Sequence, residues 1–142
     1  MQYSVKNKIP KIIMPICDET NFTLKMSSFL FDKYWPNDTK IHVLGFTKPD
    51  FKISDKMTFI SLDNQQKGGS NSWSKYILQY LKTIEDEEII LTLEDFFPTS
   101  KPNLNLINKV VNLVENSKNI GRFDLTYDSY IYGDFKIINE IN

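Results

Sequence analysis

The chain has 142 residues, 41% hydrophobic and 25% charged, a length and composition that predict one globular domain over residues 1–142. Lys and Arg number 17 against 18 Asp and Glu, and the net charge of −1 lacks the basic footprint of nucleic-acid binding. One Cys and one His exclude a disulfide framework and a zinc site built from these residue types. There is no apolar run of ~20 residues for a membrane span and no signal-peptide pattern, so we expect a soluble, cytoplasmic protein.

Apolar periodicity predicts the order β-α-β-β for the first part of the chain. Residues 9–17 are almost continuously apolar, which is typical of a strand buried on both faces of a parallel sheet. Strands are also predicted at 41–46 and 57–62, joined by a loop over 47–56. Between the first two strands, residues 20–34 have helical spacing, which predicts a helix with an apolar stripe formed by Phe22, Met26, Phe29, Leu30 and Tyr34.

The second part of the chain continues the alternation of helices and strands. A polar loop over 63–72 precedes a helix that begins at Trp73 with Ser72 as its N-cap, and a buried strand is predicted at 88–93. A third helix is opened by Ser100 and Pro102 and ended by Gly121, and further strands are predicted within 122–127 and 130–141. This order predicts an α/β domain with a mostly parallel sheet.

Acidic side chains follow three of the predicted strands. Asp18 and Glu19 follow the first strand, Asp63 follows the third, and Glu94 and Asp95 follow the fourth. In an open parallel sheet, ligands bind beyond the carboxyl ends of the strands, so these groups are expected at one rim. Carboxylates beside a loop rich in hydrogen-bond donors suit a ligand with hydroxyl groups, or a diphosphate that carries Mg²⁺ or Mn²⁺.

Each acidic pair also has a structural interpretation. Glu94 and Asp95 would point to opposite faces if the strand continued, and Asp95 is favoured for the site because Phe96 shares the face of Glu94. A solvated strand end explains the same pair equally well. Asp18 and Glu19 are better explained as residues that cap the first helix, where carboxylates favour the helix N-terminus.

Other candidate groups are explained more simply by structure than by chemistry. Residues 67–70 contain paired glycines and could cradle phosphate, but they do not match a P-loop and are typical of a flexible turn. Trp73 begins a helical aromatic stripe that indicates core packing. His42 lies within a strand and is expected to have a hydrogen-bond partner, and Cys17 is expected to pack as a small hydrophobic residue.

Four segments occur in a recognisable order: KIIMPICDET, KIHVLGF, MTFISLD and GGSNSWSKYILQYLKTIEDEEIILTLEDFFPT. The last one contains the pattern W-S-x-x-h-x-x-x-L before an acidic strand end, where h is apolar. Over roughly residues 9–129 the chain resembles the GT-A family of nucleotide-sugar glycosyltransferases. This resemblance implies a three-layer α/β/α Rossmann-like domain that binds a nucleotide-diphospho-sugar donor and transfers the sugar to a glycan or protein acceptor.

The resemblance also implies roles for particular residues. Asp95 takes the position that binds the metal ion, Mn²⁺ or Mg²⁺, or the ribose, and Glu94 is its catalytic neighbour. Contacts with the nucleotide are implied after the first strand and in the loop before the second helix, at Ile16, Cys17, Asp18, Asp63, Lys67, Asn71 and Trp73.

Two alternatives stay open at the level of sequence. Phe96 or Phe97, depending on the alignment, stands where the family's D-x-D motif would place its second Asp, which favours a non-catalytic module that binds a nucleotide, a glycan or a protein. A receiver-type signalling domain would use Asp18, Glu19 and Asp63 as an acidic pocket. An unpaired sheet edge would also allow a homo-oligomer to form.

Overall fold

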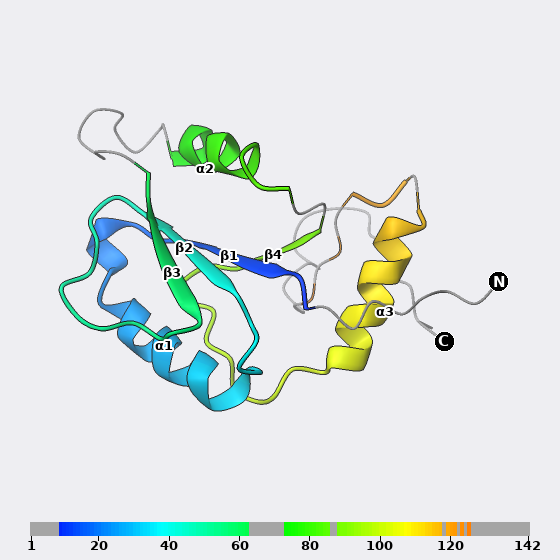
Figure 1. Ribbon diagram of the computed structural model, residues 1–142, viewed down its shortest axis with the longest axis horizontal. Coiled ribbons are helices and arrows are strands. Elements are labelled where there is room, and N and C mark those ends of the chain that lie inside the picture. Colours follow the sequence, from blue (N-terminus) through cyan, green and yellow to red (C-terminus); the bar gives the residue numbers. More distant parts are fainter. Residues whose placement is uncertain are drawn as a thin grey trace. The chain divides into compact units, whose positions relative to one another are not determined.

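The computed structural model describes residues 9–62, 73–85, 88–117, 119–121, 123 and 125 (Figure 1). These residues belong to two compact units, of which Pro10–Pro102 holds the sheet with two helices and the other contains a third helix. Within the described ranges, no helix is both long enough and apolar enough to cross a membrane. The elements, in chain order, are β1 (Lys11–Pro15), η1 (Asp18–Thr20), α1 (Thr23–Tyr34), β2 (Ile41–Gly45), β3 (Met57–Ser61), α2 (Trp73–Leu81), β4 (Ile89–Leu91) and α3 (Leu104–Glu115).

The four strands form a parallel sheet in the order β3-β2-β1-β4. The central strand β1 pairs with both neighbours through Ile12, which lies opposite Ile41 on β2 and Ile90 on β4. The predicted α/β class with a mostly parallel sheet is therefore confirmed. The chain adds β2 and β3 on one side of β1 and then places β4 on the other side, so the direction of the winding reverses between β1 and β4.

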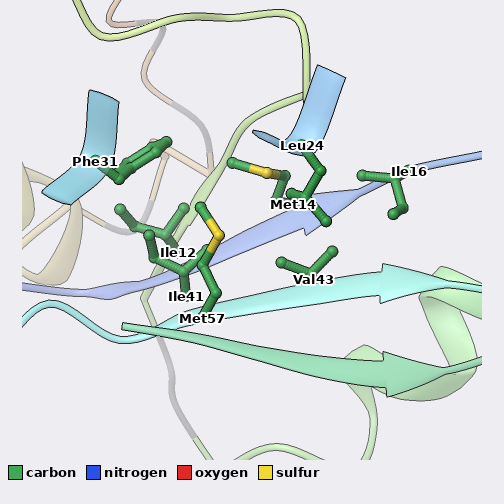
Figure 2. Close-up of a cluster of buried hydrophobic side chains, with 8 residues drawn as sticks. All are labelled: Ile12, Met14, Ile16, Leu24, Phe31, Ile41, Val43 and Met57. Carbon is green, nitrogen blue, oxygen red and sulfur yellow. The ribbon is translucent and has the colours of Figure 1, made fainter. Parts of the chain in front are cut away.

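Alternate residues of β1 contact two hydrophobic clusters, one with each helix. Ile13 packs with Ile77 of α2, together with Leu44 and Leu62. In Figure 1, α1 and α2 lie on opposite sides of the sheet. The cluster on the α1 side is drawn in Figure 2 and consists of Ile12, Met14, Ile16, Leu24, Phe31, Ile41, Val43 and Met57.

The predicted apolar stripe of the first helix is wrong at three of its five residues, because α1 turns a different face to the sheet, whereas Leu30 and Tyr34 are half-buried. Phe22, Met26 and Phe29 are 71%, 52% and 60% exposed. The buried residues of α1 are Leu24, Ser27, Ser28 and Phe31.

Hydrogen bonds explain how two serines occupy the buried face. The Ser27 hydroxyl donates to the carbonyl oxygen of Glu94 at 2.7 Å. The Ser28 hydroxyl accepts from the backbone N–H of Ser54 at 2.8 Å and lies 3.3 Å from the sulfur of Met57. Because these partners satisfy the hydroxyl groups, burial of the serines does not leave polar atoms without partners.

The loop over 47–56 joins β2 to β3 without a helix, as predicted, and is fastened to the C-terminal end of α1. The Lys56 ammonium donates to the carbonyl oxygens of Phe31, Asp32 and Trp35 at 3.0, 3.3 and 2.7 Å. It also lies 3.8 Å from a carboxylate oxygen of Asp32, and its side chain is only 7% exposed. A cation at this end of a helix is favourable, because the last carbonyl groups carry partial negative charge.

Three predicted elements differ from the structure in extent or burial. The strand predicted at 88–93 is the short edge strand β4 of the described sheet, and Leu91 is 61% exposed rather than buried. α3 is capped by Asn103, whose side chain accepts from the N–H of Leu106 at 3.1 Å, and it ends at Glu115 before Asn116 rather than at Gly121. At this end the N–H of Asn116 donates to the carbonyl oxygen of Asn112 at 3.1 Å and the N–H of Ser117 donates to that of Val114 at 3.2 Å, so carbonyl groups of the last turn have partners.

Several predictions fall outside the described residues. They are the loop over 63–72 with its N-cap Ser72, and the strands within 122–127 and 130–141 apart from residues 123 and 125.

Gly45 lets the ends of β1, β2 and β3 approach closely. A Cβ atom at this position would lie 2.8 Å from Cγ1 of Ile16 and 2.9 Å from Cε2 of Phe59. We therefore expect Gly45→Ala to lower the free energy of unfolding by about 1–3 kcal/mol, as overpacking does. Gly121→Ala is the control, since a Cβ atom at that position would meet nothing within 4 Å. Urea denaturation measures both variants, and an equal effect would contradict the close packing at Gly45.

Candidate functional site

The candidate site lies where β1 and β4 end side by side. Ile13 of β1 pairs with Leu91 of β4, and the N–H of Thr92 donates to the carbonyl oxygen of Ile13 at 3.0 Å. In open α/β sheets, ligands bind outside the carboxyl ends of strands at the point where the winding reverses. The residues that leave the sheet here are 16–18 after β1 and 92–95 after β4, and both segments contain predicted site residues.

Asp18 joins the end of β1 to the end of β2. One carboxylate oxygen accepts from the backbone N–H of Thr47 at 3.0 Å, and the other accepts from the Thr47 hydroxyl at 2.8 Å. The prediction that Asp18 caps the first helix is therefore wrong, because its carboxylate is turned toward the loop after β2. Asp18 is exposed, so the same carboxylate is also accessible to a ligand at this rim.

Cys17 and Asn21 lie on either side of the short helix η1 at the same rim. Cys17 is half-buried, and its sulfur lies 3.0 Å from the hydroxyl of Thr20. The Asn21 amide donates to the carbonyl oxygen of Thr47 at 3.3 Å, while its oxygen is buried without a hydrogen-bond partner. Sequence reasoning did not identify Asn21 or Thr47, and the available signal was that Thr47 directly follows a predicted strand.

Glu94 and Asp95 lie in a turn after β4 rather than in a continued strand. The turn is closed by the N–H of Phe96, which donates to the carbonyl oxygen of Leu93 at 3.2 Å. Glu94 is 8% exposed, whereas Asp95 is exposed. Asp95 is thus the carboxylate of this pair that solvent reaches, and the sequence favoured the same residue for a different reason.

Of the other residues predicted to contact the nucleotide, one lies in the core and three lie outside the described residues. Trp73 is half-buried at the start of α2 and packs against the cluster around Ile77, which agrees with a role in core packing. Asp63, Lys67 and Asn71 lie outside the described residues. The structure therefore places Cys17 and Asp18 just after the carboxyl end of β1 and Glu94 and Asp95 in the turn after β4, which contacts α1 through Ser27.

His42 has the hydrogen-bond partner expected of a strand histidine. Its Nδ1 atom makes a hydrogen bond with the hydroxyl of Tyr80 on α2, and the two ring centroids are 6.0 Å apart. The contact ties α2 to the face of the sheet opposite α1. His42 therefore serves the packing of the unit.

The described side chains do not build a metal site by themselves. No three His, Cys, Asp or Glu residues in the described ranges form a group that could hold a metal ion. Mg²⁺ bound with substrate phosphates, however, needs only one or two protein carboxylates. The exposed carboxylate of Asp95 fits that second kind of site.

The strand order excludes the receiver-type alternative. The doubly wound order typical of receiver domains places β1 between β2 and β3. Here β3 pairs with β2, and the second neighbour of β1 is β4. The described sheet therefore does not have the strand order that a receiver-type acidic pocket of Asp18, Glu19 and Asp63 requires.

Comparison with known proteins does not assign a family or a function to the chain. No protein-family model, curated protein or solved structure matches the chain. The strand order and the side chains that follow β1 and β4 are therefore the features that bear on function.

Proposed function

We propose that this chain is a GT-A-type glycosyltransferase-like domain that binds a nucleotide-diphospho-sugar donor between the carboxyl ends of β1 and β4. The observation that carries the proposal is the strand order β3-β2-β1-β4. Its winding reverses between β1 and β4, the two strands that Asp18 and Asp95 follow along the chain. This order matches the first four strands of a nucleotide-binding Rossmann sheet. Helices that contact both faces of the sheet are compatible with the three-layer arrangement that the proposal includes.

The proposed roles of Asp18 and Asp95 follow from their exposure and position, and the other roles follow from the resemblance to GT-A domains. Cys17 and Asp18 contact the nucleotide. Further contacts with it come from Asp63, Lys67, Asn71 and Trp73. Asp95 ligates the Mg²⁺ or Mn²⁺ ion that accompanies the diphosphate. Glu94, the residue before Asp95, is the predicted catalytic neighbour, and its side chain is buried. When bound, such an ion supplies charge neutralisation as the diphosphate departs. The sugar then passes to a glycan or protein acceptor, and the proposed setting is the cytoplasm.

Substitution of Asp95 tests the site directly. We expect Asp95→Asn to weaken binding of the donor nucleotide at least about tenfold, because one charge-assisted contact contributes roughly 1.5–3 kcal/mol. The matched control is Asp38→Asn, which changes another exposed Asp, in the turn that precedes the amino end of β2. Isothermal titration with UDP, GDP, CMP and their sugar conjugates, each with Mn²⁺ and with chelator, measures the effect.

The outcomes of this titration separate the site from the function. Binding that is equal in wild type and Asp95→Asn contradicts the role of Asp95. If no nucleotide binds to wild type with or without metal, the donor-binding proposal itself is wrong.

A second candidate function is binding at the same site without transfer. The phenylalanine that stands in place of a second Asp, Phe96 or Phe97 depending on the alignment, favours it. Incubation of the nucleotide sugar with the protein and a panel of glycans, followed by assay of released nucleotide, distinguishes the two functions. Release of nucleotide supports the transferase, and tight binding without release supports the non-catalytic module.

A further inference from the structure

Ser27 is a polar residue on the buried face of α1. Its side chain is completely buried, and Leu24 and Phe31, on either side of it along the helix, belong to the hydrophobic cluster of Figure 2. A serine within a helix commonly bonds back to a carbonyl oxygen of the preceding turn. The Ser27 hydroxyl has one proton to donate, and it donates to the carbonyl oxygen of Glu94 at 2.7 Å, across 67 residues of sequence. This hydroxyl therefore links α1 to the turn after β4.

The carbonyl group that accepts this bond belongs to the central peptide of the turn. The N–H of Phe96 donates to the carbonyl oxygen of Leu93 at 3.2 Å, so Glu94 and Asp95 are the two middle residues. The carbonyl of Glu94 and the N–H of Asp95 lie in one rigid peptide plane. Turns of types I and II hold this plane in opposite orientations. A bond to the Glu94 carbonyl therefore selects one of the two orientations.

The orientation of this peptide plane determines how Asp95 is presented. A type II turn requires a positive φ at its third residue, here Asp95, and Asp adopts such a conformation more readily than most residues. Both orientations are therefore accessible to the isolated turn, and one added hydrogen bond shifts the balance between them by about twofold to tenfold. The exposed carboxylate of Asp95 is attached directly to this plane, so its direction changes with the orientation of the plane.

We infer that Ser27 is a positioning residue of the proposed site: its buried hydroxyl holds the central peptide of the turn in one orientation and thereby directs the carboxylate of Asp95. The inference rests on the proposed function and adds to it a residue that acts through Asp95. Because Ser27 is completely buried, it does not meet the donor itself.

Alanine substitutions at the two buried serines of α1 test the inference. Ser27→Ala removes the bond to Glu94. The matched control is Ser28→Ala, because the Ser28 hydroxyl accepts from the N–H of Ser54, in the loop between β2 and β3. We expect Ser27→Ala to weaken binding of UDP, GDP or CMP with Mn²⁺ about threefold to tenfold, as loss of one hydrogen bond does. Ser28→Ala should leave the dissociation constant unchanged.

Two further measurements accompany the titration. Urea midpoints verify that every variant is folded, and a second variant, Ser27→Cys, keeps a similar volume with a weaker donor. Its loss of nucleotide affinity should lie between those of wild type and Ser27→Ala. Nucleotide affinity that is equal in wild type, Ser27→Ala and Ser27→Cys overturns the inference, and so does an equal loss from Ser27→Ala and Ser28→Ala.

A double-mutant cycle determines whether Ser27 acts through Asp95. In the Asp95→Asn background, Ser27→Ala is expected to cause little further loss of nucleotide affinity, because the group that Ser27 directs has already been changed. Equal losses in the wild-type and Asp95→Asn backgrounds would show that Ser27 acts elsewhere, and the inference would be wrong.

Backbone NMR separates the failure of this inference from the failure of the proposed function, because it needs no ligand. Ser27→Ala is expected to give a second set of amide signals, or exchange broadening, for residues 94–96 as the peptide samples both orientations. Ser28→Ala should not. If Ser27→Ala leaves these signals single and sharp, the hydroxyl does not hold the turn and only this inference is overturned. If the signals change but wild type binds no nucleotide, the proposed function is wrong and the inference is overturned with it.

Discussion

Leu24→Ala is expected to lower the free energy of unfolding by about 3 kcal/mol, whereas Phe29→Ala should change it by less than about 1 kcal/mol. Leu24 is completely buried in the cluster between α1 and the sheet, so its truncation leaves a cavity among Ile12, Met14 and their neighbours. Phe29 is 60% exposed, and its ring lies 5.9 Å from the ammonium of Lys33. Urea denaturation of both variants against wild type measures the difference.

This pair of substitutions decides which face of α1 is buried. The apolar spacing of the sequence assigns Phe29 to the buried stripe and leaves Leu24 outside it. Should Phe29→Ala prove as destabilising as Leu24→Ala, the outward face of α1 would be covered in solution and the exposure described above would be wrong.

Lys56→Met is expected to lower the free energy of unfolding by about 2 kcal/mol. Methionine keeps most of the apolar stem but removes the ammonium that serves three carbonyl oxygens at the end of α1. It also removes the cation beside Asp32, whose carboxylate remains hydrogen-bonded to Ser54 at 2.5 Å. Thermal and urea unfolding provide the measurement.

The matched control for this substitution lies four residues earlier. Lys52→Met removes a lysine whose side chain is 83% exposed. Its ammonium forms a surface ion pair with a carboxylate oxygen of Asp55 at 3.3 Å. Such surface pairs contribute little, so a change within about 0.5 kcal/mol is expected. Equal losses from Lys52→Met and Lys56→Met would show that general charge, rather than the end of α1, determines the effect.

The strands were predictable from sequence because each is a short, nearly continuous apolar run between polar segments. β1, β2 and β3 fall within the predicted ranges, and β1 is buried on both faces as its composition indicates. Composition could not show that β4 lies at the edge of the described sheet. An edge position depends on which strands pair, and EIILTL has the same apolar pattern whether one neighbour is present or two.

The buried face of α1 could not be predicted because its serines are satisfied by distant backbone. Spacing rules count Ser27 and Ser28 as polar and place them toward solvent. Their partners are Glu94 and Ser54, which are 67 and 26 residues away along the chain. Local sequence has no information on such contacts, so tertiary structure overrides the apolar pattern.

The contacts inside the candidate site could not be predicted from sequence. Parallel strands place their carboxyl ends at one rim, and from this rule we expected Asp18 and Asp95 at the same end of the sheet. The contact of Asp18 with Thr47 depends on how two loops approach one another, which periodicity does not encode. Asp95 was favoured from strand alternation, whereas the structure exposes it through a turn.

The strand order also has a consequence for the sequence of events during synthesis. Residues up to Leu62 contain α1 and three of the strands, whereas β4 begins only at Ile89. The nascent chain therefore contains β1, β2 and β3 before β4 has been made, and the segment that carries α2 is synthesised between them. A ligand of the kind proposed, bound between β1 and β4, would bind only once both are in place and, by mass action, would stabilise the pairing of the first described strand with the last one.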